Sequence, residues 1–279
     1  EFPLLNGKYY LEKNPEAWPI NEKGEKSPPA DWFMGICPTD PGFRQHRFDE
    51  LQRLLQEFEI DGLWLDYVHW HAQFETPDPI LPETCFCDRC VSTFERQMKL
   101  KVPEGNIPLR AAWILEESDS LWRIWRSNIL TGWVKEMKTV LEEKRPNALL
   151  GIFYCSWFPS DFNEALYRNL GINVYELAGI ADVLSPMLFH RMMDRPTAWV
   201  HEYVAWLDEL MSPYEGKKPA IWPIVQAHNK PGVIKAQEFY DVMKNGSRSP
   251  AAGIMMFSEQ SLLEDPEKLN VVKEFYGRH

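Results

Sequence analysis

Short apolar segments alternate with amphipathic helical segments along most of this 279-residue sequence. Six segments have the length and composition of buried strands, at 33–36, 61–66, 149–154, 182–188, 220–225 and 253–257. Helical segments are expected at 41–58, 85–100, 120–144, 162–169, 196–211, 234–244 and 266–276. This alternation predicts a parallel sheet with right-handed crossovers, because parallel neighbours require a long connection.

Two architectures fit that alternation, an eight-stranded β/α barrel and a doubly wound sheet. No glycine-rich nucleotide fingerprint follows any strand, which favours the barrel. We therefore expect an α/β fold, a (β/α)8 TIM-type barrel that is incomplete or irregular at its N-terminal end, with six clear strands. Residues 7–14 could hold one further short strand. A single domain is expected over 1–279, with 71–117 as a loop and helix insertion.

Composition excludes several classes of partner. A net charge of −11 argues against nucleic acid and anionic membranes, which both reward clustered Lys and Arg. No run of eighteen apolar residues or signal peptide is seen, so a soluble protein is expected. The chain contains 12 Trp, 10 Tyr and 15 Phe. These rings fit a heavy core, and those at strand ends could form platforms for a flat polar ligand such as a sugar.

The strand at 61–66 ends in an abrupt burst of ionisable and aromatic side chains. Leu63, Trp64 and Leu65 form its apolar run, and Asp66 and Tyr67 follow directly. Catalytic groups of parallel barrels lie at the carboxyl ends of strands, so Asp66 is the first candidate for a catalytic carboxylate.

Glycoside hydrolysis normally uses two carboxyl groups, so a second is needed. Glu259 is the best candidate, because it lies just past the last strand, although an exposed loop position fits it equally well. Asp161 and Glu164 have the spacing of a capping box, which favours a structural role. Asp182 begins its strand, at the wrong end for catalysis.

Four histidines follow strands and could contribute to a site. His69 and His71 follow one strand, His190 another and His228 a third. They could hold a metal that activates water, with Asp66, or they could bind sugar hydroxyls. The side chains that we expect to contact substrate are Tyr67, His69, Trp70, Trp157, His190, Trp222 and His228.

The cysteines give the most specific motif. Cys85, Cys87 and Cys90 lie within six residues at a helix start, and Cys37 follows the preceding strand. Four thiolates suit a tetrahedral zinc ion. Three cysteines this close cannot all find disulfide partners in a chain with five, so structural zinc is favoured over a disulfide or reduced buried thiols. It would clamp the 71–84 loop without catalysing, and no organic cofactor is expected.

The sequence Cys37-Pro-Thr-Asp-Pro-Gly-Phe-Arg44, the Asp66 strand and the C-x-C-D-R-C motif together resemble the family 42 β-galactosidases, over about residues 14–94. The resemblance implies a barrel with a zinc site of this layout after its third and fourth strands. On that register, 33–36 would be strand three and 63–66 strand four. The later segments 182–190 and 253–259 are similar to a looser group of family-10-like hypothetical glycosidases.

The departures from that family concern its catalytic residues. Family members end strand four with Asn-Glu, where this chain has Asp66 and Tyr67. Their nucleophilic Glu on strand seven has no counterpart in 220–225, which runs into Gln226. β-Galactosidase activity is therefore not implied.

The function expected from the sequence is cleavage of a glycosidic bond by paired carboxylates at the barrel mouth. The alternatives are a barrel metal-dependent hydrolase using His69, His71, His190 and His228, and a non-catalytic carbohydrate-binding pseudo-hydrolase. The expected partner is an oligosaccharide or glycoside, and a homo-oligomer is compatible with the sequence. A zinc–thiolate site favours reducing conditions, and so a cytoplasmic location.

Overall fold

The computed structural model describes residues 1–29 and 33–277. Its centre is a parallel sheet with the strand order β1-β2-β3-β4-β6-β7. The strands are β1 (Phe2–Pro3), β2 (Gly62–Asp66), β3 (Leu149–Cys155), β4 (Val183–Leu188), β5 (Ala220–Ile221), β6 (Ile224–Gln226) and β7 (Met255–Phe257).

Strands β5 and β6 occupy one strand position. Both pair with β4, Ala220 opposite Val183 and Ile224 opposite Met187. Pro223 lies between them and has no N–H to donate to a ladder, which explains the interruption. The sheet therefore has six strand positions.

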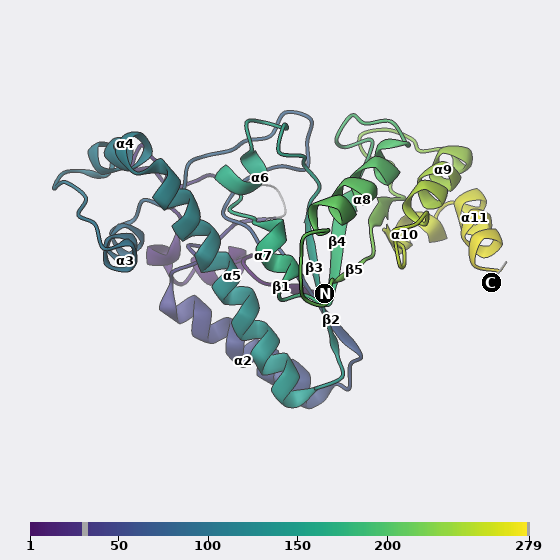
Figure 1. The fold of residues 1–279 in the computed structure, drawn as a ribbon, viewed down its shortest axis with the longest axis horizontal. Coiled ribbons are helices and arrows are strands. Elements are labelled where there is room, and N and C mark those ends of the chain that lie inside the picture. Colours follow the sequence, from purple (N-terminus) through teal and green to yellow (C-terminus); the bar gives the residue numbers. More distant parts are fainter. Residues whose placement is uncertain (30–32, 278–279) are drawn as a thin grey trace.

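The six positions curl into a half-barrel. In the part of the chain that the structure describes, β1 and β7 are its two edges. In Figure 1 the strands lie in the middle of the molecule, with α3 and α4 at one end and α9 and α11 at the other. The prediction of an α/β barrel fold with an incomplete N-terminal end is thus confirmed.

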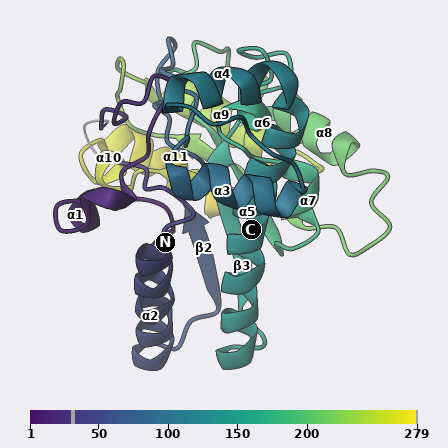
Figure 2. The same cartoon turned by 90° about the vertical axis from the view of Figure 1, so that its left-hand side faces the viewer.

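The helices are α1 (Lys8–Leu11), α2 (Pro41–Glu57), α3 (Asp88–Met98), α4 (Ile107–Glu117), α5 (Asp119–Lys144), α6 (Ala165–Arg168), α7 (Val174–Ala178), α8 (Trp199–Leu210), α9 (Ala236–Gly246), α10 (Glu259–Leu263) and α11 (Pro266–Tyr276). Helices α2 and α5 lie side by side (Figure 2). Phe48 of α2 stacks on Trp133 of α5. Of the described helices, none has both the length and the apolar character needed to cross a lipid bilayer.

Local capping explains where two of the predicted helices begin. Asp40 accepts a hydrogen bond from the backbone N–H of Phe43, and Pro41 occupies the first helical position of α2. Asp265 caps α11 in the same way, accepting from the N–H groups of Glu267 and Lys268. Both starts agree with the sequence prediction.

The prediction of a sheet strand at 33–36 is wrong. This segment makes one isolated antiparallel bridge, between Asn6 and Gly35, and joins no sheet. The N–H of Gly35 donates to Nδ1 of His71, which removes it from any ladder. Residues 7–14, where a short strand was predicted, instead contain α1, and the first strand is β1.

The expected capping box at Asp161 and Glu164 is also absent. One carboxylate oxygen of Asp161 accepts from the N–H of Phe158 at 2.9 Å, and the other pairs with Arg195 at 2.7 Å. Helix α6 begins only at Ala165, after Glu164 in a left-handed conformation. Asp161 therefore joins two loops and caps no helix.

Candidate active site and metal centre

The carboxyl ends of the parallel strands border one cavity of about 590 Å³. Asp66 ends β2, Phe257 ends β7, and Phe189 directly follows β4. The cavity is also lined by apolar side chains of the sheet, Phe153, Met187 and Ile224. Reacting groups of β/α barrels lie at this end of the sheet, so the cavity is the candidate active site.

The carboxyl group of Asp66 lines this cavity, as the sequence predicted. One of its oxygens accepts a hydrogen bond from the N–H of Tyr67 at 2.7 Å. Burial, and after it the nearby carboxylate of Glu1, raise the pKa of Asp66 to about 7, although the hydrogen bond from Tyr67 acts in the opposite direction. Asp66 therefore changes its charge near neutral pH.

Tyr67 lines the same cavity from a strained backbone position. Its φ of 53° lies in the left-handed region, which bulky side chains rarely adopt. The ring of Tyr67 stacks on that of Phe33, with centroids 4.9 Å apart and an interplanar angle of 5°. Strain of this kind, on the order of 1 kcal/mol, concentrates at functional sites.

Glu75 is a further carboxyl group on the cavity, which Glu1 and Glu264 also line, and the sequence did not predict it. It lies in the irregular loop after β2 and lines the cavity together with Asp66. Burial raises the pKa of Glu75 to about 7. The only available signal was its place in the loop that follows the Asp66 strand, where no periodicity separates one acid from another.

Glu259, the expected second carboxylate, is exposed and does not line the cavity. It is the first residue of α10, and its neighbours Ser258, Gln260 and Ser261 contribute to the lining instead. The chain enters a helix at this position, and the side chain of Glu259 turns away from the mouth.

Two phenylalanines and a histidine form an aromatic wall on the cavity. Phe189 and Phe257 are stacked with centroids 5.6 Å apart. The ring of His228 meets both of them edge-on, at 5.7 and 5.8 Å. Of the histidines expected to contact substrate, only His228 lines this cavity among the described residues.

The three tryptophans expected to stack on sugars lie elsewhere. Trp70 is fully buried and donates from Nε1 to the carbonyl of Arg126. Trp157 is buried against Phe74, and Trp222 stacks on Trp64. Trp70 and Trp157 belong to the core, because large aromatic surface gains most when it is removed from water, whereas Trp222 is only partly buried.

The other three histidines do not line the cavity, and their ring nitrogens contact groups of the protein. His71 uses both ring nitrogens, accepting from the N–H of Gly35 at 3.1 Å and contacting the carbonyl of Pro28 at 2.7 Å. Nδ1 of His69 contacts the carbonyl of Trp70 at 2.8 Å. His69 and His71 are both buried, and burial lowers each pKa to about 4, so both are neutral near pH 7.

His190, which follows Phe189 in the sequence, is buried, with Nε2 2.7 Å from a carboxylate oxygen of Glu238. Within 1–29 and 33–277, the four cysteines are the only group of three or more His, Cys, Asp or Glu side chains whose ligand atoms converge. The four histidines therefore form no common metal site, and the geometry does not support the metal-dependent hydrolase.

Gln226 occupies the end of β6. It is fully buried, its Oε1 accepts from the N–H of Arg191 at 3.0 Å, and its Nε2 donates to the carbonyl of His228 at 3.2 Å. The amide thus links the loops after β4 and β6. This position has no carboxylate and no free group to attack a substrate.

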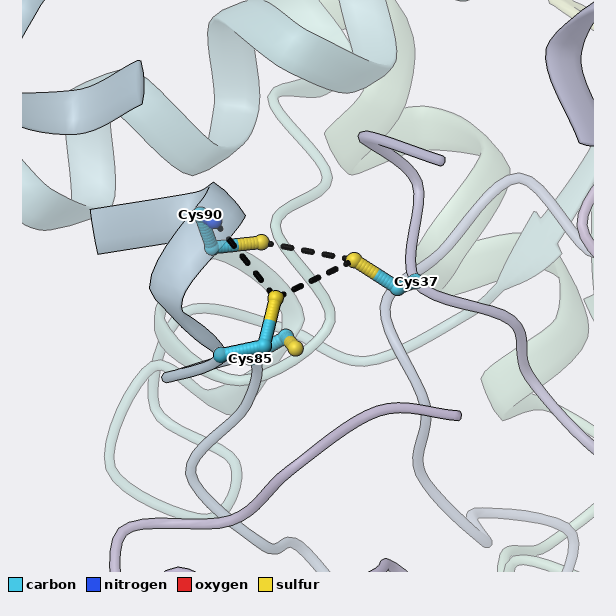
Figure 3. A group of neighbouring side chains, drawn as sticks. Cys37, Cys85 and Cys90 are labelled. Atoms are coloured by element: carbon cyan, nitrogen blue, oxygen red, sulfur yellow. Dashed lines mark hydrogen bonds between the residues drawn. The ribbon is translucent and has the colours of Figure 1, made fainter. Parts of the chain in front are cut away.

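The four predicted cysteines converge from two distant parts of the chain. All their Sγ atoms lie within 4.8 Å of one another. Sγ of Cys37 is 3.4 Å from that of Cys90 and 3.8 Å from that of Cys87. Figure 3 shows Cys37 facing Cys90, with Cys85 beside them. All four are free thiols, so the alternative of a disulfide is not supported.

This arrangement fits a tetrahedral zinc ion. Thiolates about 2.3 Å from a tetrahedral zinc lie roughly 3.8 Å apart, close to the distances seen here. The N–H of Ile20 donates to Sγ of Cys85 at 3.3 Å, and that of Cys90 donates to Sγ of Cys87 at 3.5 Å. Such donors stabilise negative charge on thiolate ligands. The donor set is complete, so a bound ion would keep no open position for substrate.

The half-barrel matches the fold of TIM-barrel glycosidase domains. No protein-family model matches the sequence, and no curated protein matches it. Among solved structures, the glycoside hydrolase domain of PgaB (BpsB) from Bordetella bronchiseptica is similar at 12% identity and a TM-score of 0.62, covering 89% of this chain and 65% of that one.

Two β-galactosidases are similar as well. That from the psychrophilic Marinomonas ef1 has 10% identity and a TM-score of 0.61, covering 91% of this chain and 42% of its own. Gan42B, a family 42 enzyme from G. stearothermophilus, has 15% identity and a TM-score of 0.59, covering 90% and 39%. The chain thus spans just under two thirds of the PgaB domain and about two fifths of the β-galactosidases. The likeness expected from the cysteine motif is confirmed at the level of fold.

Proposed function

We propose that this chain is a glycoside hydrolase domain that cleaves a glycosidic bond with Asp66 and Glu75. One observation carries the proposal: two carboxyl groups, each with its pKa raised to about 7, line one cavity at the carboxyl ends of a glycosidase-like sheet. Paired carboxyl groups on such a cavity are what hydrolysis through an oxocarbenium-like transition state requires.

The surroundings of the two groups suggest separate roles. Asp66 accepts a backbone N–H, which favours its ionised form. Burial alone raises the pKa of Glu75, which favours its protonated form. We assign Glu75 as the acid that protonates the departing glycosidic oxygen. Asp66 then acts on the anomeric carbon, either directly as nucleophile or as the base for an attacking water.

The aromatic wall and Tyr67 would bind the sugar. Phe257 offers a ring face, and His228 and Tyr67 offer polar atoms to hydroxyl groups. A zinc ion held by Cys37, Cys85, Cys87 and Cys90 would supply no chemistry to this reaction, only a tie between distant segments.

The test is a screen of aryl-glycosides and oligosaccharides, followed by NMR of the first-formed sugar product. Release of a reducing sugar supports the proposal, and the product anomer distinguishes attack by Asp66 from attack by water. Carbohydrate binding without any cleavage would instead identify a pseudo-hydrolase.

Activity should depend on pH as a narrow bell centred near pH 7. Asp66 must be ionised, so kcat/KM falls as the pH drops below about 7. Glu75 must be protonated, so kcat/KM also falls as the pH rises above about 7. The charge of Glu75 also contributes to the raised pKa of Asp66, so the protonation of one group affects the other. Rates measured from pH 4 to 10 check this, and Glu75→Gln should remove the alkaline limb from any residual activity.

Replacing Phe257 with alanine should weaken substrate binding. The ring is 46% exposed, which leaves its face available to a sugar. Removing one stacking ring is expected to raise KM roughly tenfold, with a smaller change in kcat. Phe58→Ala is the matched control, because Phe58 is also exposed but follows α2, away from the cavity. Equal KM values for the two variants would refute the stacking role.

A further inference from the structure

Lys268 is a lysine with no exposed surface, which is rare because an amino group is costly to remove from water. It lies in the first turn of α11, and its side chain points back toward the sheet. Nζ donates to the carbonyl of Ala227 at 2.8 Å and to Oδ1 of Asn229 at 2.7 Å. Asp265 is the nearest carboxylate, at 3.7 Å. The main partners of Lys268 are thus in the loop after β6.

That loop carries two residues of the candidate active site, His228 and Lys230, which both line the cavity. Gln226 and the end of β7 also hold this loop. Nε2 of Gln226 donates to the carbonyls of His228 and Lys230. The N–H groups of Ala227 and His228 both reach the carbonyl of Phe257, at 2.7 and 3.2 Å. Oδ1 of Asn229 also accepts from the N–H of Ile234 at 2.9 Å. Asn229 is therefore held between Lys268 and the residues that lead into α9.

The two sides of the cavity are fixed by different means. Asp66 is part of β2, which the sheet holds on both sides. His228 and Lys230 follow the short strand β6 in a loop without regular structure. Buried hydrogen bonds to side chains are what such a loop needs to keep one conformation. Gln226 supplies them from the loop's beginning and Lys268 from the C-terminal helix.

We propose that Lys268 is a positioning residue of the active site: it fixes the His228–Lys230 side of the cavity for substrate, without touching substrate itself. This inference rests on the proposed function, since it assigns the loop to substrate binding. It predicts an effect on affinity and none on proton transfer, because Asp66 and Glu75 lie on elements that Lys268 does not contact.

The test compares Lys268→Met with Lys273→Met. Methionine keeps the length of the side chain but cannot donate, and Lys273 is an exposed lysine of the same helix. Lys268→Met should raise KM about tenfold, in keeping with the loss of two buried hydrogen bonds, and leave both limbs of the pH profile in place. Hydrogen exchange should accelerate at 227–231 and stay unchanged at 66–75. Lys273→Met should behave as wild type.

Asn229→Ala provides a second variant, because it removes one acceptor of Lys268 without altering α11. It should raise KM in the same direction, and Lys268→Arg, which restores a donor, should recover part of the affinity. A lower melting temperature with unchanged KM in both Lys268→Met and Asn229→Ala would overturn the proposal and leave a purely structural lysine. A wild-type chain that neither binds nor cleaves any carbohydrate would instead refute the proposed function itself.

Discussion

Asp66→Asn should reduce kcat by about a thousandfold or more while the fold stays intact. The amide has nearly the shape of the carboxyl group, but it can neither attack an anomeric carbon nor accept a proton from water. Rates on the best substrate from the glycoside screen, with circular dichroism of the same sample, check the expectation. Full turnover by this variant would refute the role of Asp66.

Glu259→Gln is the matched control for that experiment. Glu259 follows the last strand in the sequence as Asp66 follows its own, but its side chain is exposed and outside the cavity. We expect wild-type activity from Glu259→Gln. A comparable loss in both variants would contradict Glu75 as the second carboxyl group and favour Glu259.

The melting temperature of Asp66→Asn shows whether the buried carboxyl group of Asp66 stabilises the fold or destabilises it, as expected of a group kept for function. The pKa of Asp66 is about 7 in the folded chain, above the value of about 3.9 for an exposed Asp. Below that lower value the group is protonated in both states and its burial costs no stability. The penalty grows as the pH rises from about 4 to about 7, because only the unfolded chain loses the proton there, and it is constant above about pH 7. Asp66→Asn should therefore melt at a higher temperature than wild type at pH 8, and the gap should close near pH 4.

Cys87→Ser should release zinc, because three thiolates hold the ion far less tightly than four. Its loss should lower the free energy of unfolding by about 3 kcal/mol. For a chain of this size the melting temperature should fall by roughly 10 °C. Metal analysis should find one zinc per wild-type chain and much less in the variant. Proteolysis or hydrogen exchange should show loosening in 71–90, the segment that leads from β2 into the first turn of α3.

Cys155→Ser is the control for the metal centre. Cys155 is the fifth cysteine, buried in β3 and outside the cluster of Sγ atoms. Its substitution places a hydroxyl in the core and can lower stability, but it should leave the zinc content at one per chain. Unchanged zinc in Cys87→Ser, or equal loss in both variants, would contradict the four-cysteine site.

The sequence predicted correctly those features that a few neighbouring residues decide, such as two helix starts and the cysteine motif. Asp40 followed by Pro41, and Asp265 followed by Pro266, start helices through a side chain and a fixed φ within one turn. The three clustered cysteines were also predictable from local sequence, because a ligand motif within six residues can be recognised from its spacing. Asp66 was found because an apolar run ends directly before it.

The errors arose where distant contacts compete with local pattern. Residues 33–36 have the composition of a strand, but His71 and residues 5–7 take their backbone groups. Trp70 and Trp157 looked available at strand ends and are core. No sequence pattern distinguishes Glu75 from other acidic residues, because it reaches the cavity of Asp66 only through the course of its loop. Glu259 has the right position in the chain and the wrong orientation.

The sequence by itself determined the class of fold, the main helices, the four cysteines and one carboxylate, because periodicity, capping and ligand spacing act over a few residues. Only the tertiary structure decided which carboxyl groups share a cavity with Asp66 and that Glu75 is buried among them. It also decided which rings form the aromatic wall, and that a buried lysine from the last helix contacts the loop on one side of the cavity. Those features depend on how loops from separate strands fold over a common mouth, and on burial that raises the pKa of one acid and leaves another exposed.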